Sequence, residues 1–155
     1  MMSTVQEVKD IIERAAKMPW GPACSAELAR AVVLVDSLEG EEELRIETYI
    51  QLATAYQQGN EEWKALAPTA WLVAKFDENP AAFEADQIES LAWLYKNATS
   101  ATGRNPAVSK EQALELSEGF GKFIQDQGYS MHAVHGVRFA LALRMGDPVA
   151  AHEEL

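Results

Sequence analysis

Two histidines lie three residues apart, a spacing that could support metal chemistry. If the segment around them is helical, His132 and His135 share one face, and their imidazoles could ligate one transition-metal ion together. The surrounding sequence offers no evident third or fourth ligand. A pair of surface or packing histidines explains the spacing better, so we expect neither a metal site nor a cofactor.

The short motifs of common enzyme classes are missing. The sequence contains no His-Glu-x-x-His, no Gly-x-x-x-x-Gly-Lys-Ser/Thr and no Gly-x-Gly-x-x-Gly. Gly119-Phe120-Gly121-Lys122 is only a partial phosphate loop inside a helical pattern. There each glycine costs about 1 kcal/mol relative to alanine unless a neighbouring helix approaches closely. We expect no catalytic residues, and we rank an enzyme third among the interpretations of this chain.

Composition and charge narrow the class of partner. The 155 residues carry a formal charge of −11, which argues against nucleic acid or an anionic membrane as the main partner. Cys24 cannot form an internal disulfide, and we interpret it as a small packing residue. The N-terminus lacks the apolar run of a secretion signal, and no run approaches the length of a membrane span. A cytoplasmic protein is expected.

Apolar residues at helical spacing predict helices along the chain, separated by short breaks. Ser3 or Thr4 caps the first helix, Gly40 ends the second, and the third extends from the acidic run 41–43 to Gly59. These signals place the first three helices.

The middle of the chain is harder to interpret. Asn60 is expected to cap a fourth helix, and Pro68 within it predicts a kink or an offset start. Asn79 and Pro80 are expected to open a fifth helix. The residues that fall on one stripe of the fourth helix are Trp63, Ala67, Ala70 and Ala74.

The C-terminal part contains further turn signals. The longest loop is expected at 97–106, where turn-forming residues break the periodicity. Ser109, with Gln112 as partner in a capping box, predicts the start of a sixth helix, and Ser130 caps a seventh. Asp147-Pro148 opens an eighth, which has little chain left before Leu155. Either this helix frays or the natural chain continues, and we favour the second.

One signature occurs twice at the same internal spacing. A large residue is followed by a small one, then by a large one three positions on, and then by Gly-Asn or Gly-Asp, which suits a tightly packed helix that stops and restarts. The two copies are Leu52-Ala53-x-x-Tyr56-x-x-Gly59-Asn60 and Phe139-Ala140-x-x-Leu143-x-x-Gly146-Asp147.

Together with Ala65 and the segment 77–80, the first copy resembles a tetratricopeptide repeat. The second copy is similar, whereas Leu91-Ala92-x-x-Tyr95 matches only the first-helix part. The intervals between Ala53, Ala92 and Ala140 are 39 and 48 residues, in place of the family's 34, so the repeat is degenerate.

This resemblance implies an all-α fold of antiparallel helical hairpins stacked as a right-handed solenoid. Residues 1–155 would form a single such domain, which we interpret as the N-terminal part of a longer chain. An irregular helical bundle is the alternative.

The resemblance also implies a function and a surface. The expected function is a non-enzymatic scaffold that binds a peptide or protein segment in a concave helical groove, and the alternative is a regulatory sensor for a signalling peptide or small molecule. Trp63 and Trp71 are interpreted as packing residues, while binding and packing are equally supported for Trp93. The expected groove residues are Gln51, Thr54, Glu89, Trp93, Lys96, Arg138, Leu141 and Arg144.

Two further expectations concern this surface and the end of the chain. The groove would be acidic near Glu47, Asp86 and Glu89 and basic near Arg138 and Arg144, which suits a peptide of mixed charge. An incomplete last hairpin near Val149 and Ala150 could also support self-association.

Overall fold

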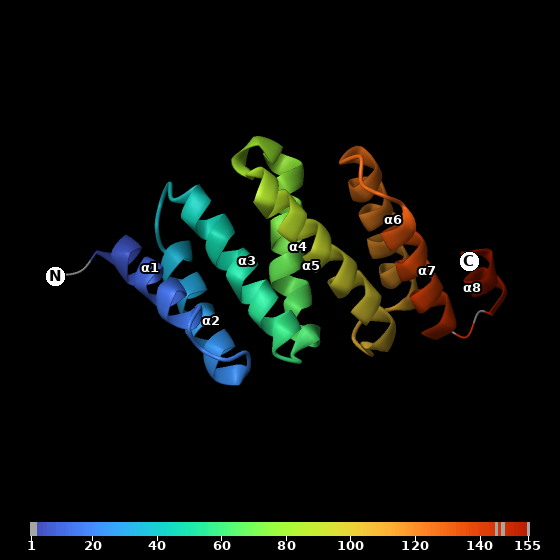
Figure 1. The fold of residues 1–155 in the computed structure, drawn as a ribbon, viewed down its shortest axis with the longest axis horizontal. Helices are drawn as coiled ribbons and strands as arrows, with labels where there is room; N and C mark the ends of the chain where they lie inside the picture. The colour runs from blue at the N-terminus through green and yellow to red at the C-terminus, as the bar shows by residue number, and fades with distance from the viewer. Residues whose placement is uncertain (1–2, 145, 147, 155) are drawn as a thin grey trace. The chain divides into compact units, whose positions relative to one another are not determined.

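The computed structural model describes residues 3–144, 146 and 148–154, and its regular elements are helices (Figure 1). Because no strand occurs among these residues, the prediction of an all-α fold is confirmed. No helix in the described part of the chain is both long and apolar enough to cross a bilayer. The elements are α1 (Thr4–Ala15), α2 (Pro22–Asp36), α3 (Glu42–Gln58), α4 (Glu62–Glu78), η1 (Pro80–Ala82), α5 (Ala85–Ala101), η2 (Thr102–Arg104), α6 (Lys110–Asp126), α7 (His132–Arg144) and α8 (Pro148–Glu153).

The chain divides into two compact units, residues 1–94 and 95–155. Helix α5 begins in the first unit and ends in the second. The expectation of one domain over residues 1–155 stays a prediction.

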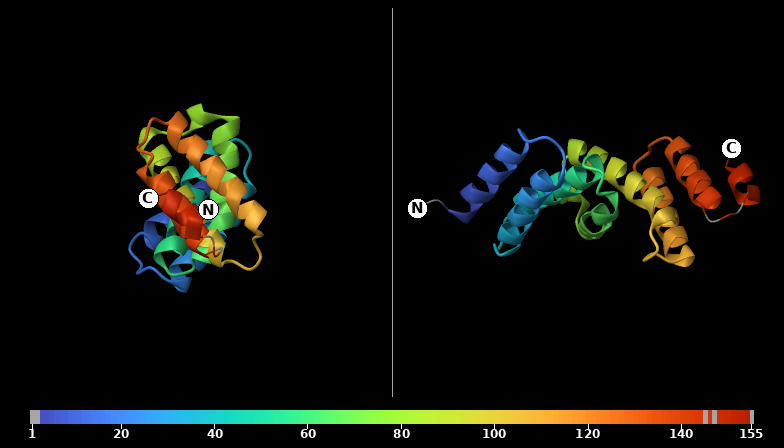
Figure 2. Two further views of the ribbon diagram at one scale, coloured as in Figure 1. Left: turned by 90° about the vertical axis from the view of Figure 1, so that its right-hand side faces the viewer. Right: turned by 90° about the horizontal axis from the view of Figure 1, so that it is seen from below.

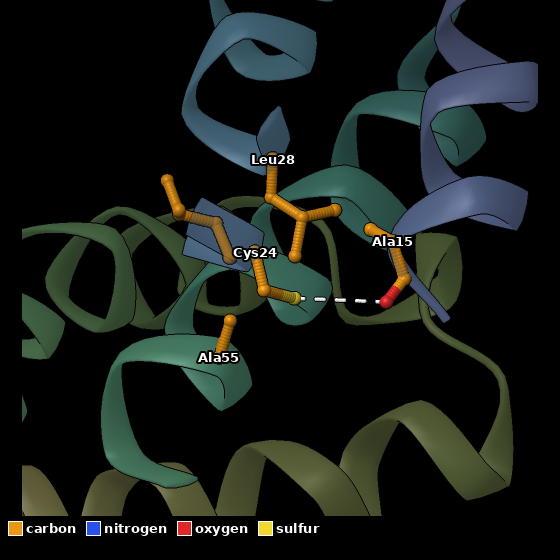
Figure 3. Close-up of a cluster of buried hydrophobic side chains, with 5 residues drawn as sticks. Ala15, Cys24, Leu28 and Ala55 are labelled. Atoms are coloured by element: carbon orange, nitrogen blue, oxygen red, sulfur yellow. Dashed lines mark hydrogen bonds between the residues drawn. The ribbon is translucent and has the colours of Figure 1, made fainter. Parts of the chain in front are cut away.

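In the first unit, α1 packs against α2, α2 against α3, and α3 against α4 (Figure 1). Val8 and Ile11 of α1 meet Ala31 and Val35 of α2 in one buried cluster. A second cluster joins α1, α2 and α3, and it includes the fully buried Cys24, whose Sγ lies 3.6 Å from the carbonyl oxygen of Ala15 (Figure 3). Cys24 is therefore a packing residue, as the sequence predicts.

Local capping groups account for two of the helix ends in this unit. The Ser3 side chain accepts a hydrogen bond from the backbone N–H of Gln6, so Ser3 caps α1 as expected. At the end of α2, the guanidinium group of Arg45 donates to the backbone carbonyls of Val35 and Leu38. Arg45 thereby adds a side-chain donor to two carbonyls of the turn that ends α2, and it ties this turn to α3.

The prediction that Asn60 caps α4 is wrong. Asn60 adopts a φ of 60°, and the N–H group of Glu61 donates to the carbonyl of Tyr56. This is the left-handed residue that ends a helix, a conformation that asparagine tolerates better than most residues. Asn60 therefore terminates α3, and Glu61 occupies the position before α4.

The stripe predicted for α4 faces solvent. Trp63 is 60% exposed, and Ala67, Ala70 and Ala74 are exposed as well, so the assignment of Trp63 to packing is wrong. The helix is continuous through Pro68. Its buried residues are Ala65, Pro68, Thr69, Leu72 and Phe76. Trp71 does pack, because its ring is stacked on Tyr49 with 3.9 Å between the ring centroids.

Helix α5 starts later and ends later than predicted. Pro80 opens the short 3-10 helix η1, and α5 begins at Ala85. The expected loop at 97–106 is instead helical as far as Arg104, because α5 continues to Ala101 and η2 follows it. Thr102 contributes to this continuation, since its hydroxyl donates to the carbonyl of Thr99 and both residues are buried.

The second unit contains the end of α5, η2, α6, α7 and α8, with α6 packed on α7 and α7 on α8 (Figure 2). Ser109 and Gln112 form the predicted capping box at the start of α6. The hydroxyl of Ser130 accepts from the N–H group of His132 at the start of α7. The predicted cap Asp147 lies outside the described residues.

Close approaches explain the two glycines inside α6. A Cβ atom at Gly119 would lie 2.5 Å from the hydroxyl oxygen of Tyr95, and one at Gly121 would lie 3.2 Å from Nη2 of Arg138. Side chains of α5 and α7 thus lie against the backbone of α6. The predicted close approach of neighbouring helices therefore accounts for both glycines inside α6.

Candidate functional site

A hollow of about 450 Å³ lies on the first unit, between α3 and the first half of α5. It is open to solvent and combines carboxylates, hydroxyl groups, an amide and an indole ring. The lining residues are Thr54, Gln58, Asp86, Glu89, Ser90 and Trp93.

Helix geometry brings these side chains to one place. Thr54 and Gln58 are four residues apart on α3, and Asp86, Glu89 and Trp93 recur every three or four residues on α5. Residues at these intervals lie on the same face of a helix. Two helical stripes therefore face the same space, and each contributes polar side chains to it.

Gln87 fixes the start of α5 against α3. Its side-chain carbonyl oxygen accepts from the N–H group of Glu84 at 2.9 Å, which caps the first turn of α5. Its side-chain amide donates to the Glu47 carboxylate at 3.4 Å, and Gln51 donates to the other oxygen of Glu47 at 2.9 Å. Glu47 is thus held by two amides, and the helix that carries Asp86 and Glu89 is positioned through it.

The two carboxylates that line the hollow are exposed. One oxygen of Asp86 accepts from the N–H group of Gln87 at 3.0 Å. No hydrogen bond or ion pair of the Glu89 carboxylate is recorded in the described part of the chain. Trp93 is 39% exposed, so its side chain is accessible to a ligand, as the predicted binding role requires.

The basic side chains of α3 and α4 are engaged elsewhere. Arg45 pairs with Asp36 and Glu42, Lys64 pairs with Glu61, and Lys75 pairs with Glu42 and Glu78. The lining of the hollow itself contains no lysine or arginine. Its fixed charges are therefore negative.

Three of the predicted groove residues, Thr54, Glu89 and Trp93, come together in this hollow. Gln51 does not line it, and is half-buried with its amide bonded to Glu47. Gln58 and Ser90 are lining residues that the sequence reasoning missed. The signal that could have found them is their position four residues after Thr54 and Asp86 on the same faces.

The other four predicted groove residues belong to the second unit, and they have different surroundings there. Lys96 is exposed and Arg138 is half-buried. Arg144 donates to the backbone carbonyl of Ser100, and burial lowers the pKa of its guanidinium group. Leu141 is 1% exposed and belongs to the core, so its prediction as a surface residue is wrong.

Leu141 is buried because η2 closes over α7. A Cβ atom at Gly103 would lie 3.2 Å from Cδ2 of Leu141 and 3.1 Å from Cδ of Arg144. The sequence reasoning placed a loop at this point, and a flexible loop would have left the face of α7 open. The short helix after α5 covers it instead.

The histidine pair lies on the surface of α7. His132 and His135 are exposed, and Nδ1 of His135 lies 2.7 Å from a carboxylate oxygen of Glu154, which links α7 to α8. Within the described residues, no group of three or more His, Cys, Asp or Glu side chains is arranged to hold a metal ion. Val149 is exposed on α8, and the side chain of Ala150 lies outside the described residues.

Comparisons with protein-family models, with curated proteins and with solved structures return no match for this chain. The residues and the geometry of the hollow are therefore the basis for a functional assignment.

Proposed function

We propose that this protein is a non-enzymatic scaffold that binds a peptide or a segment of another protein in the hollow between α3 and α5. The observation that carries the proposal is the position of Trp93. It is a large aromatic side chain, substantially exposed, at the edge of a hollow lined by hydrogen-bonding groups. Tryptophan is enriched among the residues that dominate binding energy at protein interfaces.

The mixed lining supports a peptide ligand. Thr54, Gln58 and Ser90 can exchange hydrogen bonds with a backbone, and the carboxylates of Asp86 and Glu89 add charge selectivity. A hollow of about 450 Å³ is large enough for one or two anchoring side chains. A segment that passes over its mouth can insert these side chains and leave the rest of its chain in solvent.

The open form of the hollow favours a scaffold over the alternative sensor. A small-molecule sensor encloses most of its ligand, whereas this hollow is open to solvent. The proposal includes the right-handed, tetratricopeptide-like arrangement of hairpins expected from the sequence, and a cytoplasmic location. The packing of consecutive helices from α1 to α4 is consistent with such hairpins.

The test is selection from a randomised peptide library with the protein immobilised, followed by fluorescence anisotropy of the selected peptides. Trp93→Ala should weaken binding at least about tenfold, or about 1.4 kcal/mol. Trp63→Ala is the matched control, because Trp63 is also an exposed tryptophan, lies on α4 and does not line the hollow. It should leave the affinity unchanged.

Two results would overturn the proposal. One is a library from which no peptide is selected, although circular dichroism shows a folded helical protein. The other is a set of selected peptides whose affinities fall equally with Trp63→Ala and Trp93→Ala, or with neither, since binding would then occur away from the hollow.

A further inference from the structure

The chemistry of the hollow specifies which kind of side chain it accepts. Two of its six lining residues are carboxylates and none is basic. Asp86, Glu89 and Trp93 occupy one face of α5, so the two negative charges and the indole lie along the same stripe. An anionic group, such as a peptide C-terminus or a phosphate, would be repelled there. A cation would be attracted.

The basic side chains of α3 and α4 do not neutralise the carboxylates of the hollow. Within the first unit, the arginine and lysines of α3 and α4 are paired with Asp36, Glu42, Glu61 and Glu78. Glu47 is held by the neutral amides of Gln51 and of Gln87, the residue that follows Asp86. Neutral partners leave the negative charge of Glu47 in place, so it adds to the potential near Asp86 and Glu89.

The indole distinguishes among cations. An aromatic face attracts a cation, and a guanidinium group stacks on it while its N–H groups donate to carboxylates in the same plane. The ammonium group of lysine is a more strongly hydrated point charge without this planar fork. The hydroxyls of Thr54 and Ser90 and the carbonyl of Gln58 offer further acceptors for the five guanidinium donors.

We infer that the hollow is an arginine-binding site, which takes one arginine side chain of a partner peptide between Trp93 and the carboxylates of Asp86 and Glu89. This inference rests on the proposed function and specifies the residue that anchors the peptide. The guanidinium group enters the hollow, stacks on the indole of Trp93 and donates to the two carboxylates. The peptide backbone stays at the open mouth.

The test compares two synthetic bead libraries with a fixed central residue and three randomised positions on each side. One library carries arginine at the centre and the other carries citrulline, which has the same shape with a neutral urea group. Many beads of the arginine library and few beads of the citrulline library should bind the labelled protein. Individual pairs of peptides should differ at least about tenfold in affinity, or about 1.4 kcal/mol.

Variants assign the effect to the hollow. Glu89→Gln removes one charge from an exposed side chain, so folding should be unaffected, and it should weaken arginine peptides while leaving citrulline peptides unchanged. Glu115→Gln removes the same charge from an exposed position on α6. It should change neither the affinity for arginine peptides nor the affinity for citrulline peptides. Replacing arginine by lysine in the best peptides should lower affinity, and added salt should weaken the arginine peptides most.

The possible results separate this inference from the proposed function. If both libraries bind equally and Trp93→Ala abolishes the binding of both, the scaffold stands and the arginine site is overturned. Equal affinity of the arginine peptides for the parent, Glu89→Gln and Glu115→Gln also overturns it. If neither library binds the folded protein, both the inference and the proposed function fail.

Discussion

The hydroxyl group of Ser25 donates a hydrogen bond of 2.8 Å to the carboxylate of Glu61, and both side chains are buried. This contact joins the first turn of α2 to the residue that precedes α4. Glu61 also pairs with Lys64 at 2.7 Å. The hydrogen bond from Lys64 and then that from Ser25 lower the pKa of Glu61 below its ordinary value.

Replacing Ser25 by alanine should destabilise the protein by about 1–2 kcal/mol, because the Glu61 carboxylate would lose a partner while remaining buried. Urea unfolding at neutral pH, followed by circular dichroism, measures this change. Ser37→Ala is the control, since the Ser37 hydroxyl bonds only to the Leu34 carbonyl of its own helix end and is exposed. An equal loss of unfolding free energy in both variants would show that the Ser25–Glu61 contact does not stabilise the protein.

The pKa of Glu61 predicts how stability depends on pH. Because the pKa is lower in the folded protein than the ordinary value of 4.5, the ionised carboxylate stabilises the fold above that value. This contribution is lost as the pH falls through the folded-state pKa. The stability difference between the parent and Glu61→Gln should therefore narrow in acid. Thermal unfolding of both proteins over a pH series tests this prediction. A difference in melting temperature that does not change with pH would contradict it.

Tyr49 predicts an effect at alkaline pH. Burial and the hydrogen bond from its hydroxyl to Asp36 raise the pKa of Tyr49 to about 12. Since the unfolded phenol ionises near its ordinary value of 10, the neutral phenol stabilises the fold at lower pH, and this stability is lost as the pH rises above that value. The melting temperature of Tyr49→Phe should therefore fall less at alkaline pH than that of the parent. Thermal unfolding over an alkaline pH series measures the decline, and parallel declines would refute the assignment.

The contact between Gly119 and Tyr95 predicts a double-mutant result. In Gly119→Ala the new methyl group would lie 2.5 Å from the hydroxyl oxygen of the buried Tyr95, so the variant should lose about 1–3 kcal/mol. With Tyr95→Phe in the background, the nearest ring atom lies 3.8 Å away, and alanine should then cost nothing or stabilise α6 by its helix propensity.

The free energy of unfolding of the four proteins in this cycle measures the coupling between the two positions. A cost for Gly119→Ala that is the same with tyrosine and with phenylalanine would show that the hydroxyl group is not the obstacle.

Helix ends were predictable where the signal is local. The cap at Ser3 and the capping box of Ser109 and Gln112 depend on residues three apart, so the sequence contains all of the interaction. The buried face of α4 was not predictable in this way, because an alanine-rich helix has no distinct apolar stripe. The large indole of Trp63 suggested burial, yet the helix turns Leu72 and Phe76 inward and leaves Trp63 in solvent.

The candidate site was predictable only in part. Thr54, Glu89 and Trp93 follow from helix faces, and they do line one hollow. The contact that sets the spacing of α3 and α5, from Gln87 to Glu47, joins residues 40 apart and has no local signature. Leu141 failed as a surface residue because its burial depends on η2, a short helix in a segment whose composition favours a loop.

The continuity of α5 has a consequence for how the sequence can change. Trp93 lines the hollow, and two residues later the ring of Tyr95 lies edge-on to Phe120 with 5.4 Å between centroids. Each residue turns a helix by about 100°, so one inserted or deleted residue between them would turn Tyr95 by that angle about the axis of α5 relative to Trp93. Point substitutions can accumulate on the exposed side of α5. They leave the angle between Trp93 and Tyr95 unchanged, whereas a change in the length of the helix does not.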